Sequence, residues 1–445
     1  MELSDRIAGL MPQAKRDLSE LVSYRSVADP RQFPAEECAK AAEWVLAKFS
    51  QIGFAGQLVT TSDGSKAVYG ERKGPAGART VLLYAHYDVQ PPLGDDLWQT
   101  PPFELTERNG RWYGRGAADC KGNIIMNLVA LRALAKDIPL NLKLIVEGAE
   151  EQSSEGLEDF VRNAGDMLSA DAILVCDTGG AAVGRPAATI SLRGNADIIV
   201  TVDALGSNLH SGVFGGAAPD ALAALIRMLG TLRDRQGNTT IAGLDNTRTW
   251  PGEKYPGAQF RADAQMLEGT QLLGEGSVAD MIWARLTATV VGIDCPPVVG
   301  APSAIQSRAR ARINLRVPPG VDPARAQDAL VAQLHDSAPW GVQVSIERTV
   351  PDNPFLAETG GPAYRTLAAA MHEAYGEEMA TLGLGGSIPL CNTFSAAFPR
   401  AEIILIGVEE PRAQIHAPNE SVDPNEIANM ALAEAIFLQR YAAMA

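Results

Sequence analysis

Two histidines and five carboxylates have the residue types needed to bind metal ions and to move protons. They occur at the ends of short apolar runs or in glycine-rich turns, and not inside amphipathic helices. In chain order they are His86 and Asp88 in YAHYDVQPP, Asp119 at the end of GRGAAD, Glu150 and Glu151 after LKLIVEGA, Asp177 after AILVC, and His416 in QIHAPNE. The remaining three of the five histidines lie elsewhere.

The ends of strands are where ligands bind in open α/β sheets. Carboxylates gathered at one such edge, without enough basic residues to neutralise them, need positive charge, and divalent cations supply it. The Glu150–Glu151 pair directly follows an apolar strand, where charged groups are costly unless they are paired or metal-bound. Each signal is weak by itself, but their combination predicts a metal site.

The elements that must position these residues alternate between helical and strand patterns. The predicted helices cover 35–51, 122–136, 155–163, 361–375 and 424–442, and the predicted strands cover 80–85, 141–147, 172–176 and 401–408. This alternation is typical of helices packed on a mostly parallel sheet. We therefore expect an α/β catalytic domain formed by 1–188 and 351–445.

The middle of the chain has a different pattern, with strands that follow one another closely. It predicts strands over 188–192, 197–204, 309–317 and 342–350, helices over 219–235 and 323–335, and irregular chain over 237–286. We interpret 189–350 as an inserted α+β domain. Such an insertion is expected to serve as a lid or a dimerisation domain.

The composition of the 445 residues excludes several classes of function. A net charge of −15 argues against a nucleic-acid partner, which would require a basic face. The apolar runs have the length of strands, and the first residues lack the basic and apolar regions of a signal peptide. Five widely spaced cysteines without a CxxC pair suggest neither disulfides nor a thiolate zinc site. We expect a cytoplasmic protein with no membrane partner and with free, mostly buried thiols.

Six segments together resemble the aminoacylase/carnosinase superfamily of two-metal peptidases. They are YAHYDVQPP, WYGRGAADCKG, VEGAEEQSSEGL, LHSGVFGG, GGSIP and IHAPNE. The form HYDVQPP, with the following WQTPPFE, is similar to the carnosinase-like dipeptidase branch. The resemblance covers nearly the whole chain, and it implies a dimeric, metal-dependent hydrolase of dipeptides or short peptides.

The resemblance implies a specific set of metal ligands. One ion would be held by His86, Asp119 and Asp177, and the other by Asp119, Glu151 and His416. Asp119 would bridge two divalent ions, with zinc expected and manganese or cobalt as alternatives, since histidine and carboxylate ligands accept all three.

The resemblance also implies roles for the two remaining carboxylates. Glu150 would be the general base, acting on a metal-bridging water, and Asp88 would orient His86 through its second ring nitrogen. A metal-bound histidine commonly donates its other N–H to a carboxylate, and a non-ligand carboxylate can carry a proton to the leaving amine. The family further suggests a cis peptide after Asp119. Cys120 stands in place of the usual Asp, Asn or Met, and its side chain is expected to point away from the metals.

Substrate recognition is expected from the inserted domain and one later loop. His210 matches the family histidine that stabilises the oxyanion, supplied by the partner subunit of a homodimer. Arg316 matches the arginine that grips a substrate carboxylate, and Ser303 stands where the branch usually has threonine. Gly385, Gly386 and Ser387 form a loop expected to bind the carboxyl end of the substrate.

Two alternatives remain beside the dipeptidase. An N-acyl-amino-acid deacylase or related amidohydrolase would use the same metal site, and a panel of dipeptides and N-acyl amino acids separates the two. A non-catalytic binding dimer would be expected to have lost a ligand or the base, and none of these residue types is missing.

Overall fold

The computed structural model describes residues 2–134 and 138–444 and divides them into two compact units. The second unit comprises Ser191–Leu356 and Gly383–Ile388, and the first comprises the other described residues. The predicted inserted domain, 189–350, therefore differs at both ends from the compact unit. The prediction also omitted the short segment Gly383–Ile388, which lies far along the chain. The local sequence of this segment does not indicate that it belongs to the second unit.

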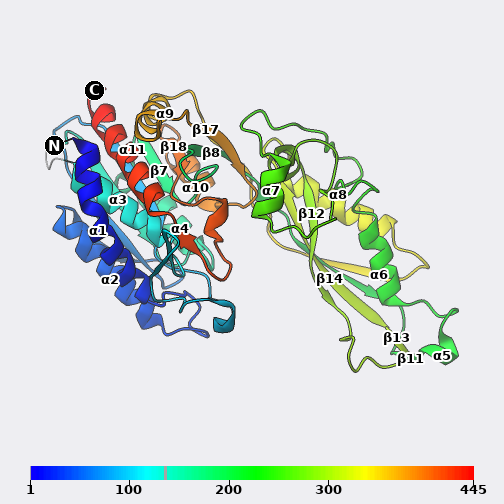
Figure 1. The fold of residues 1–445 in the computed structure, drawn as a ribbon. Helices are drawn as coiled ribbons and strands as arrows, with labels where there is room; N and C mark the ends of the chain where they lie inside the picture. The colour runs from blue at the N-terminus through cyan, green and yellow to red at the C-terminus, as the bar shows by residue number, and fades with distance from the viewer. Residues whose placement is uncertain (1, 135–137, 445) are drawn as a thin grey trace. The chain divides into compact units, whose positions relative to one another are not determined.

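The first unit is built on a mixed, mostly parallel sheet flanked by helices (Figure 1). Its strands follow the order β1-β2-β6-β3-β7-β18-β8-β16, with β17 also on β8. Their bounds are β1 (Ala55–Thr60), β2 (Lys66–Arg72), β3 (Thr80–His86), β6 (Asn141–Glu147), β7 (Ala172–Cys176), β8 (Ala187–Leu192), β16 (Phe355–Leu356), β17 (Ala380–Leu384) and β18 (Glu402–Ile406). Of these, β16 and the last residues of β8 and β17 fall within the bounds of the second unit. The central strands β6, β3, β7 and β18 are parallel, while β1 and β2 are antiparallel to their neighbours.

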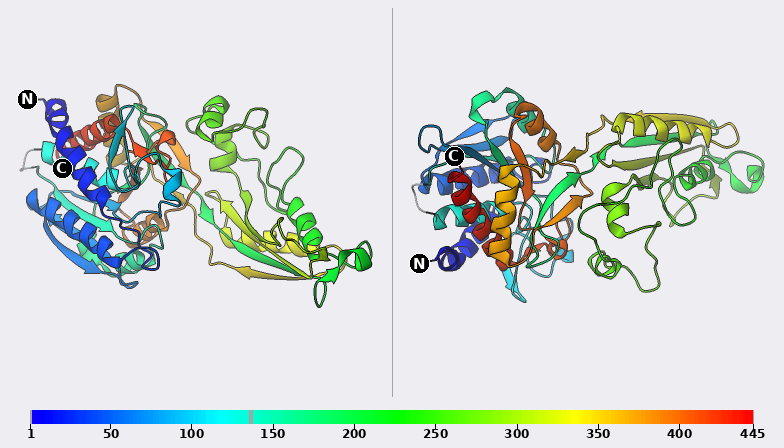
Figure 2. Two further views of the ribbon diagram at one scale, coloured as in Figure 1. Left: turned by 60° about the horizontal axis from the view of Figure 1, so that its bottom comes forward. Right: turned by 90° about the horizontal axis from the view of Figure 1, so that it is seen from above.

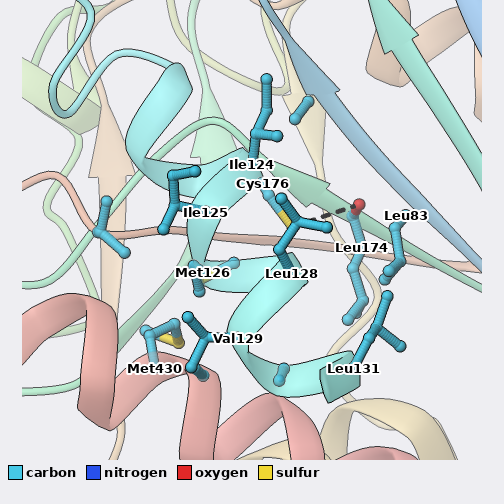
Figure 3. Close-up of a cluster of buried hydrophobic side chains, with 14 of the residues drawn as sticks. Leu83, Ile124, Ile125, Met126, Leu128, Val129, Leu131, Leu174, Cys176 and Met430 are labelled. Atoms are coloured by element: carbon cyan, nitrogen blue, oxygen red, sulfur yellow. Dashed lines mark hydrogen bonds between the residues drawn. The ribbon is translucent and has the colours of Figure 1, made fainter. Parts of the chain in front are cut away.

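Helices cover both faces of this sheet. They are α1 (Leu3–Ser23), α2 (Ala35–Gln51), α3 (Lys121–Ala133), α4 (Glu155–Asn163), α9 (Pro362–Tyr375), α10 (Pro389–Ala397) and α11 (Pro424–Ala442). Helix α3 packs between α1 and α11 and against β3, on the face to which Leu83 points (Figure 3). On β3 the neighbouring Tyr84 points to the other face, where its ring meets Phe394 of α10.

Helix α3 is mostly apolar and is buried on nearly all sides, as expected of a helix in a core. Its side chains, among them Ile124, Leu128 and Leu131, fill the space between the sheet and α11 (Figure 3). The helix was predicted over 122–136; it runs over Lys121–Ala133, and 135–137 lie outside the described residues. Because α3 begins two residues after Asp119, this core fixes the position of that carboxylate.

Short elements complete the first unit. A small sheet joins β4 (Thr106–Arg108), β5 (Arg111–Tyr113) and β19 (Ser421–Val422), and the 3-10 turns are η1 (Asp95–Leu97), η2 (Gly165–Met167) and η4 (Pro411–Ala413). The pairing of β19 with β5 brings the segment after His416 against the segment before Asp119. Two distant parts of the chain thereby meet near the predicted site.

The second unit is an antiparallel sheet with the order β12-β14-β10-β15, covered by two helices (Figure 2). Its elements are β9 (Gly194–Asn195), β10 (Ile198–Asp203), β11 (Leu209–His210), α5 (Ser211–Phe214), α6 (Ala221–Gly230), α7 (Gly257–Asp263), the π-helical turn η3 (Asp280–Ala284), β12 (Thr287–Asp294), β13 (Ala304–Ile305), β14 (Arg308–Val317), α8 (Pro323–Asp336) and β15 (Gln343–Arg348). The alternate residues of β14 face α6 and α8, which gives this unit a core of its own.

One predicted helix of this unit was too long. The helix expected over 219–235 begins after Asp220, whose carboxylate accepts hydrogen bonds from the backbone N–H groups of Leu222 and Ala223, and it ends at Gly230. Glycine weakens a helix, and the Thr231 hydroxyl donates to a carbonyl of the last turn. Beyond it Arg233 pairs with Thr239 in an isolated bridge, so local polar bonding replaces the expected last turns.

Candidate active site

Three parallel strands of the first unit bring predicted residues to one edge of the sheet. The carboxyl ends of parallel strands share an edge, and that edge is the usual ligand site. His86 is the last residue of β3, and Glu150 and Glu151 lie in the turn after β6. Asp177 directly follows β7. The strand order therefore explains why residues far apart in the sequence become neighbours.

Asp119 lies between two histidines. The Nε2 atom of His86 is 3.0 Å from one Asp119 carboxylate oxygen, and Nε2 of His416 is 2.9 Å from the other. His86 Nε2 is also 3.1 Å from Asp177 Oδ1, and His416 Nε2 is 3.2 Å from Glu151 Oε2. Each oxygen of Asp119 thus belongs to a separate group of potential metal ligands.

Glu150 stands beside these groups. Its Oε2 atom is 3.9 Å from His86 Nε2, farther than the Asp119 and Asp177 oxygens. In residues 2–134 and 138–444, the clusters of three or more potential ligands include Glu151 and leave Glu150 out. Burial, and next the charge of Asp177, raise the pKa of the Glu150 carboxyl well above its ordinary range.

The charges of the site fit divalent cations. Besides Glu150, the buried Asp177 carboxyl has a pKa raised to about 6, chiefly by desolvation. Desolvation, and next the charge of Asp119, raise the pKa of the buried Glu409 carboxyl well above its ordinary range. So many acidic groups in a small volume repel one another unless a cation joins them. Imidazole nitrogens and carboxylate oxygens suit zinc and manganese alike.

Asp88 has a wider structural role than the predicted contact with His86. Its carboxylate Oδ1 is 3.4 Å from His86 Nδ1, and its backbone carbonyl lies 3.1 Å from the same nitrogen. The two carboxylate oxygens also accept hydrogen bonds from the backbone N–H groups of Glu150 and Glu151, at 3.1 and 3.0 Å. One fully buried carboxylate therefore holds the histidine of β3 and the glutamate pair of the neighbouring strand.

The turn that carries Asp119 is held by Glu420, a residue that the sequence analysis did not select. The Glu420 carboxylate accepts hydrogen bonds from the backbone N–H groups of Gly116, Ala118 and Asp119 at 3.0–3.1 Å. It also forms a fully buried ion pair with Arg115, at 2.7 Å. The peptide bond between Asp119 and Cys120 is cis, as the resemblance suggested. The acidic end of IHAPNE was the available signal for Glu420.

Glu409 was also missed. Together with Asp119 and Asp177 it forms a third group of potential ligand atoms. Glu409 follows β18, and its backbone packs directly against Gly179. A Cβ atom at position 179 would lie 1.7 Å from the Glu409 carbonyl oxygen. Only the position of the acidic pair after a strand could have pointed to it, as it did for Glu150 and Glu151.

His416 adopts a backbone conformation that is unusual for its residue type. Its φ angle is 62°, in the left-handed region that non-glycine residues rarely occupy. Such conformations cluster at functional sites, because the surrounding structure must hold them. His416 contacts Glu151. Hydrogen bonds from the backbone and the side chain of Gln90 hold Glu151 in place.

Cys120 is closer to the site than the sequence suggested. Its thiol donates to the Cys176 carbonyl at 2.9 Å, yet the sulfur belongs to a group of potential ligand atoms with His86 and Asp177. The expectation that it points away from the metal ligands is therefore wrong. Burial raises the pKa of this thiol well above its usual range, which favours the neutral form. All five cysteines are free and three are buried, as predicted.

The predicted substrate residues all lie in the second unit. His210 pairs with Ala304 between β11 and β13, and the Ser303 carbonyl accepts hydrogen bonds from Ser211, so His210 and Ser303 share one end of this unit. The guanidinium of Arg316, on β14, donates to Asn314. Because the metal-binding candidates belong to the first unit, the substrate roles of these residues stay predictions.

The loop of Gly385, Gly386 and Ser387 also belongs to the second unit. The carbonyl of Gly385 accepts a hydrogen bond from Nε of Arg193, a residue that the sequence analysis did not select. Burial, and next the neighbouring charge of Arg316, lower the pKa of Arg193 to about 10. Arg193 also donates to the Thr287 hydroxyl, so it links this loop to β12.

None of the helices in the described residues combines the length and the hydropathy that a bilayer crossing requires. This finding concerns residues 2–134 and 138–444.

Comparison with known proteins agrees with the geometry of the site. The chain is 43% identical over 443 residues to the cysteinylglycine-S-conjugate dipeptidase of Corynebacterium striatum, with 97% of each chain covered. It is 28% identical to the Cys-Gly metallodipeptidase dug1 of Schizosaccharomyces pombe, over 91% of this chain and 90% of that one. The crystal structure of human carnosine dipeptidase 1 shares the fold, with a TM-score of 0.85, 24% identity, and 99% and 98% of the two chains covered. The peptidase family M20/M25/M40 matches residues 82–440. The chain therefore belongs to the peptidase family M20/M25/M40.

Proposed function

We propose that this protein is a metal-dependent dipeptidase that cleaves the peptide bond of small dipeptides. The observation that carries the proposal is Asp119, whose two oxygens face His86 and His416 separately while Glu150 stays outside both groups. The names of the relatives, a cysteinylglycine-S-conjugate dipeptidase and a Cys-Gly metallodipeptidase, support the same reaction.

Two divalent ions would be held by the residues around Asp119. His86 and Asp177 would complete one site, and Glu151 and His416 the other. Zinc is the ion we propose, with manganese and cobalt as alternatives that this set of nitrogen and oxygen ligands also accepts. When bound, the ions polarise the scissile carbonyl and acidify the attacking water.

Glu150 would then transfer the proton. Its carboxylate lies next to the ligand groups without belonging to them, so it is available to take a proton from the attacking water and deliver it to the leaving amine. Asp88 would position the base, since it binds the backbone N–H of Glu150 and the ring of His86. Asp88 is therefore a positioning residue for both partners.

Substitution of Glu150 tests this mechanism. Glu150→Gln keeps the shape of the side chain and removes the base, so kcat should fall by at least about 10³-fold, within the range of general acid–base catalysis. The metal content of the variant, measured by elemental analysis, should match the wild type. Glu155→Gln, on the exposed first turn of α4, is the control. Normal turnover of the Glu150 variant would contradict the mechanism.

The proposed substrates are dipeptides with a free terminal carboxylate, in particular cysteinylglycine and its S-substituted forms. Arg316 would bind the carboxylate through its planar guanidinium, with the loop of Gly386 and Ser387 beside it. Ser303 would contribute to substrate binding from the end of the second unit that carries His210. A panel of dipeptides and N-acetyl or N-succinyl amino acids, run with zinc, manganese and cobalt, tests this assignment. A preference for N-acyl amino acids would instead favour a deacylase.

We further propose a homodimer through the second unit. Strand β12 is an edge of its sheet, and it exposes Val290, Val291 and Ile293 to solvent. Apolar edge strands invite pairing with another chain. In the dimer His210, itself exposed, would act at the partner's site as an oxyanion donor.

Mixing two inactive variants tests the dimer. His210→Ala and Glu150→Ala subunits should regain part of the activity in heterodimers, because one site would then hold both intact residues. Heterodimers without any recovered activity would exclude the trans role of His210.

The thiols support a cytoplasmic location. All five cysteines are free, and disulfides are rare in reducing compartments. Cell fractionation with an antibody to the native protein tests this assignment.

A further inference from the structure

Glu409 is a carboxylate at the candidate metal centre that no proposed step uses. One of its oxygens and one oxygen each of Asp119 and Asp177 all lie within 4.8 Å of one another. The three residues belong to the first unit, so their arrangement does not depend on the second unit. The Glu409 carboxylate is also near enough to His86 for the two charges to interact. Glu409 therefore lies beside the ligand group that contains His86.

The pairing of β18 with β7 fixes the backbone position of Glu409. The two strands are parallel, with Ile406 opposite Cys176, and the same register continues beyond their ends to an isolated bridge between Glu409 and Gly179. Asp177 directly follows β7 and lies two residues before this glycine. Strand register therefore holds Glu409 next to the end of β7 that carries a candidate ligand.

The Glu409 carboxylate has fewer partners than the acidic side chain beside it. Among the described residues it accepts one hydrogen bond, a long one of 3.4 Å from the amide of Asn123, and it forms no ion pair. The adjacent Glu410 instead pairs with Arg111 and accepts the backbone N–H of Arg412 at 2.8 Å. A carboxylate among other carboxylates is costly unless a cation joins them. Glu409 is therefore placed to bind a cation that the neighbouring acidic groups share.

Asn123 contributes to the placement of the Glu409 side chain. It is fully buried on α3, the helix that begins two residues after Asp119. Its side-chain oxygen accepts the backbone N–H of Val408 at 2.9 Å, which leaves its amide nitrogen to face Glu409. One helix therefore supports both Asp119 and the contact to Glu409, so the two carboxylates are positioned together.

We propose that Glu409 is a further ligand of the ion held by His86, Asp119 and Asp177, and that it shifts this position toward manganese. The inference rests on the proposed metal-dependent dipeptidase and specifies the ion that one of its two positions prefers. With Glu409 this position has one imidazole and three carboxylates, whereas the other position has one imidazole and two carboxylates. Carboxylate oxygens suit manganese, while imidazole nitrogens suit zinc. The additional carboxylate therefore makes the two positions unequal.

Binding of Mn²⁺ and Zn²⁺ to the chelated full chain tests the proposal. Glu409→Gln keeps the shape of the side chain and removes its charge. The affinity of the variant for Mn²⁺ at one of the two positions should fall by at least about tenfold, measured by electron paramagnetic resonance of the free ion, and its affinity for Zn²⁺ should fall less. Glu358→Gln, exposed in the same unit, is the matched control. Equal Mn²⁺ affinities of the wild type and Glu409→Gln would overturn the proposal.

Thermal unfolding distinguishes a metal ligand from a structural residue. Without metal, Glu409 adds a like charge beside Asp119 and Asp177, so chelated Glu409→Gln should melt no lower than the chelated wild type. Added Mn²⁺ should raise the melting temperature of the variant less than that of the wild type, because it binds the variant more weakly. A chelated variant that melts below the chelated wild type, with an equal rise on adding Mn²⁺, would show a structural role and overturn the proposal.

The outcomes separate this inference from the proposed function. If the wild type binds two ions and loses hydrolysis on chelation, an unchanged Mn²⁺ affinity in Glu409→Gln overturns the role of Glu409 while the dipeptidase stands. Unchanged metal affinity with a raised KM for dipeptides would assign the carboxylate to the free amine of the substrate and also overturn the ligand role. A wild-type protein that binds no divalent ion would instead refute the metal-dependent dipeptidase itself.

Discussion

Glu434 lies on α11, and its side chain is fully buried. Replacing it by glutamine measures how one buried, ionisable carboxyl changes the free energy of unfolding with pH. Neither carboxyl oxygen has a hydrogen-bond partner among the described residues. Burial raises the pKa of this group from 4.5 to about 8. The folded state therefore keeps Glu434 protonated at pH values where the unfolded chain has released the proton.

The sign and the size of the effect follow from this difference. Because the folded pKa lies above the unfolded one, the neutral carboxyl is fully compatible with folding below pH 4.5, and stability is lost as pH rises through about 8. Between pH 5 and pH 8 the free energy of unfolding therefore falls by the equivalent of about 2.5 pK units, which at ~1.4 kcal/mol per unit is about 3–4 kcal/mol.

Thermal unfolding of the wild type and of Glu434→Gln, measured between pH 5 and pH 8, is the assay. Glutamine cannot ionise. Between pH 5 and pH 8 the melting temperature of Glu434→Gln should therefore fall by about 6 °C less than that of the wild type, at ~2 °C per kcal/mol. Glu43→Gln, on the exposed face of α2, should follow the wild type. Parallel pH profiles for the wild type and Glu434→Gln would refute the reasoning, because other titrating groups are common to both proteins.

Three further predictions concern the metal site and its supports. Arg115→Met leaves the Glu420 carboxylate buried without its partner, and should lower the free energy of unfolding by about 3–5 kcal/mol in denaturant titrations; an unchanged free energy of unfolding would contradict a stabilising ion pair. Chelation should abolish hydrolysis and lower the melting temperature, and added zinc should restore both; full activity of the chelated protein would contradict a metal mechanism. Asp88→Asn should weaken zinc binding about 10–100-fold in competition titrations, because the acceptor behind His86 loses its charge; unchanged affinity would exclude an orienting role.

The strands at the centre of the first unit were predictable from local pattern. The apolar runs before His86 and Asp177 became β3 and β7, and the acidic pair after β6 lies at the same edge of the sheet. A buried parallel strand needs apolar residues throughout, so the run and its polar end are visible in the sequence. The mostly parallel sheet with flanking helices was correctly predicted for the same reason.

Other features depended on contacts that local pattern does not encode. Helix α6 ended at Gly230 because polar groups beyond it found tertiary partners, and Gly383–Ile388 joined the second unit although its neighbours in sequence belong to the first. In the sequence Glu420 is only an acidic residue two positions after Pro418. Its role is revealed by the hydrogen bonds that it accepts from the backbone of the Asp119 turn.

The sequence by itself determined the residue types of the site and the strand ends at which they occur. Only the tertiary structure decided that the two oxygens of Asp119 face different histidines, that Glu150 stays outside both groups, and that Glu434 is buried with no hydrogen-bond partner among the described residues. The physical reason is that periodicity reports which face of an element is apolar, whereas the neighbours of a side chain depend on the order in which strands pair. That order joins residues such as His86 and His416, which no local pattern relates.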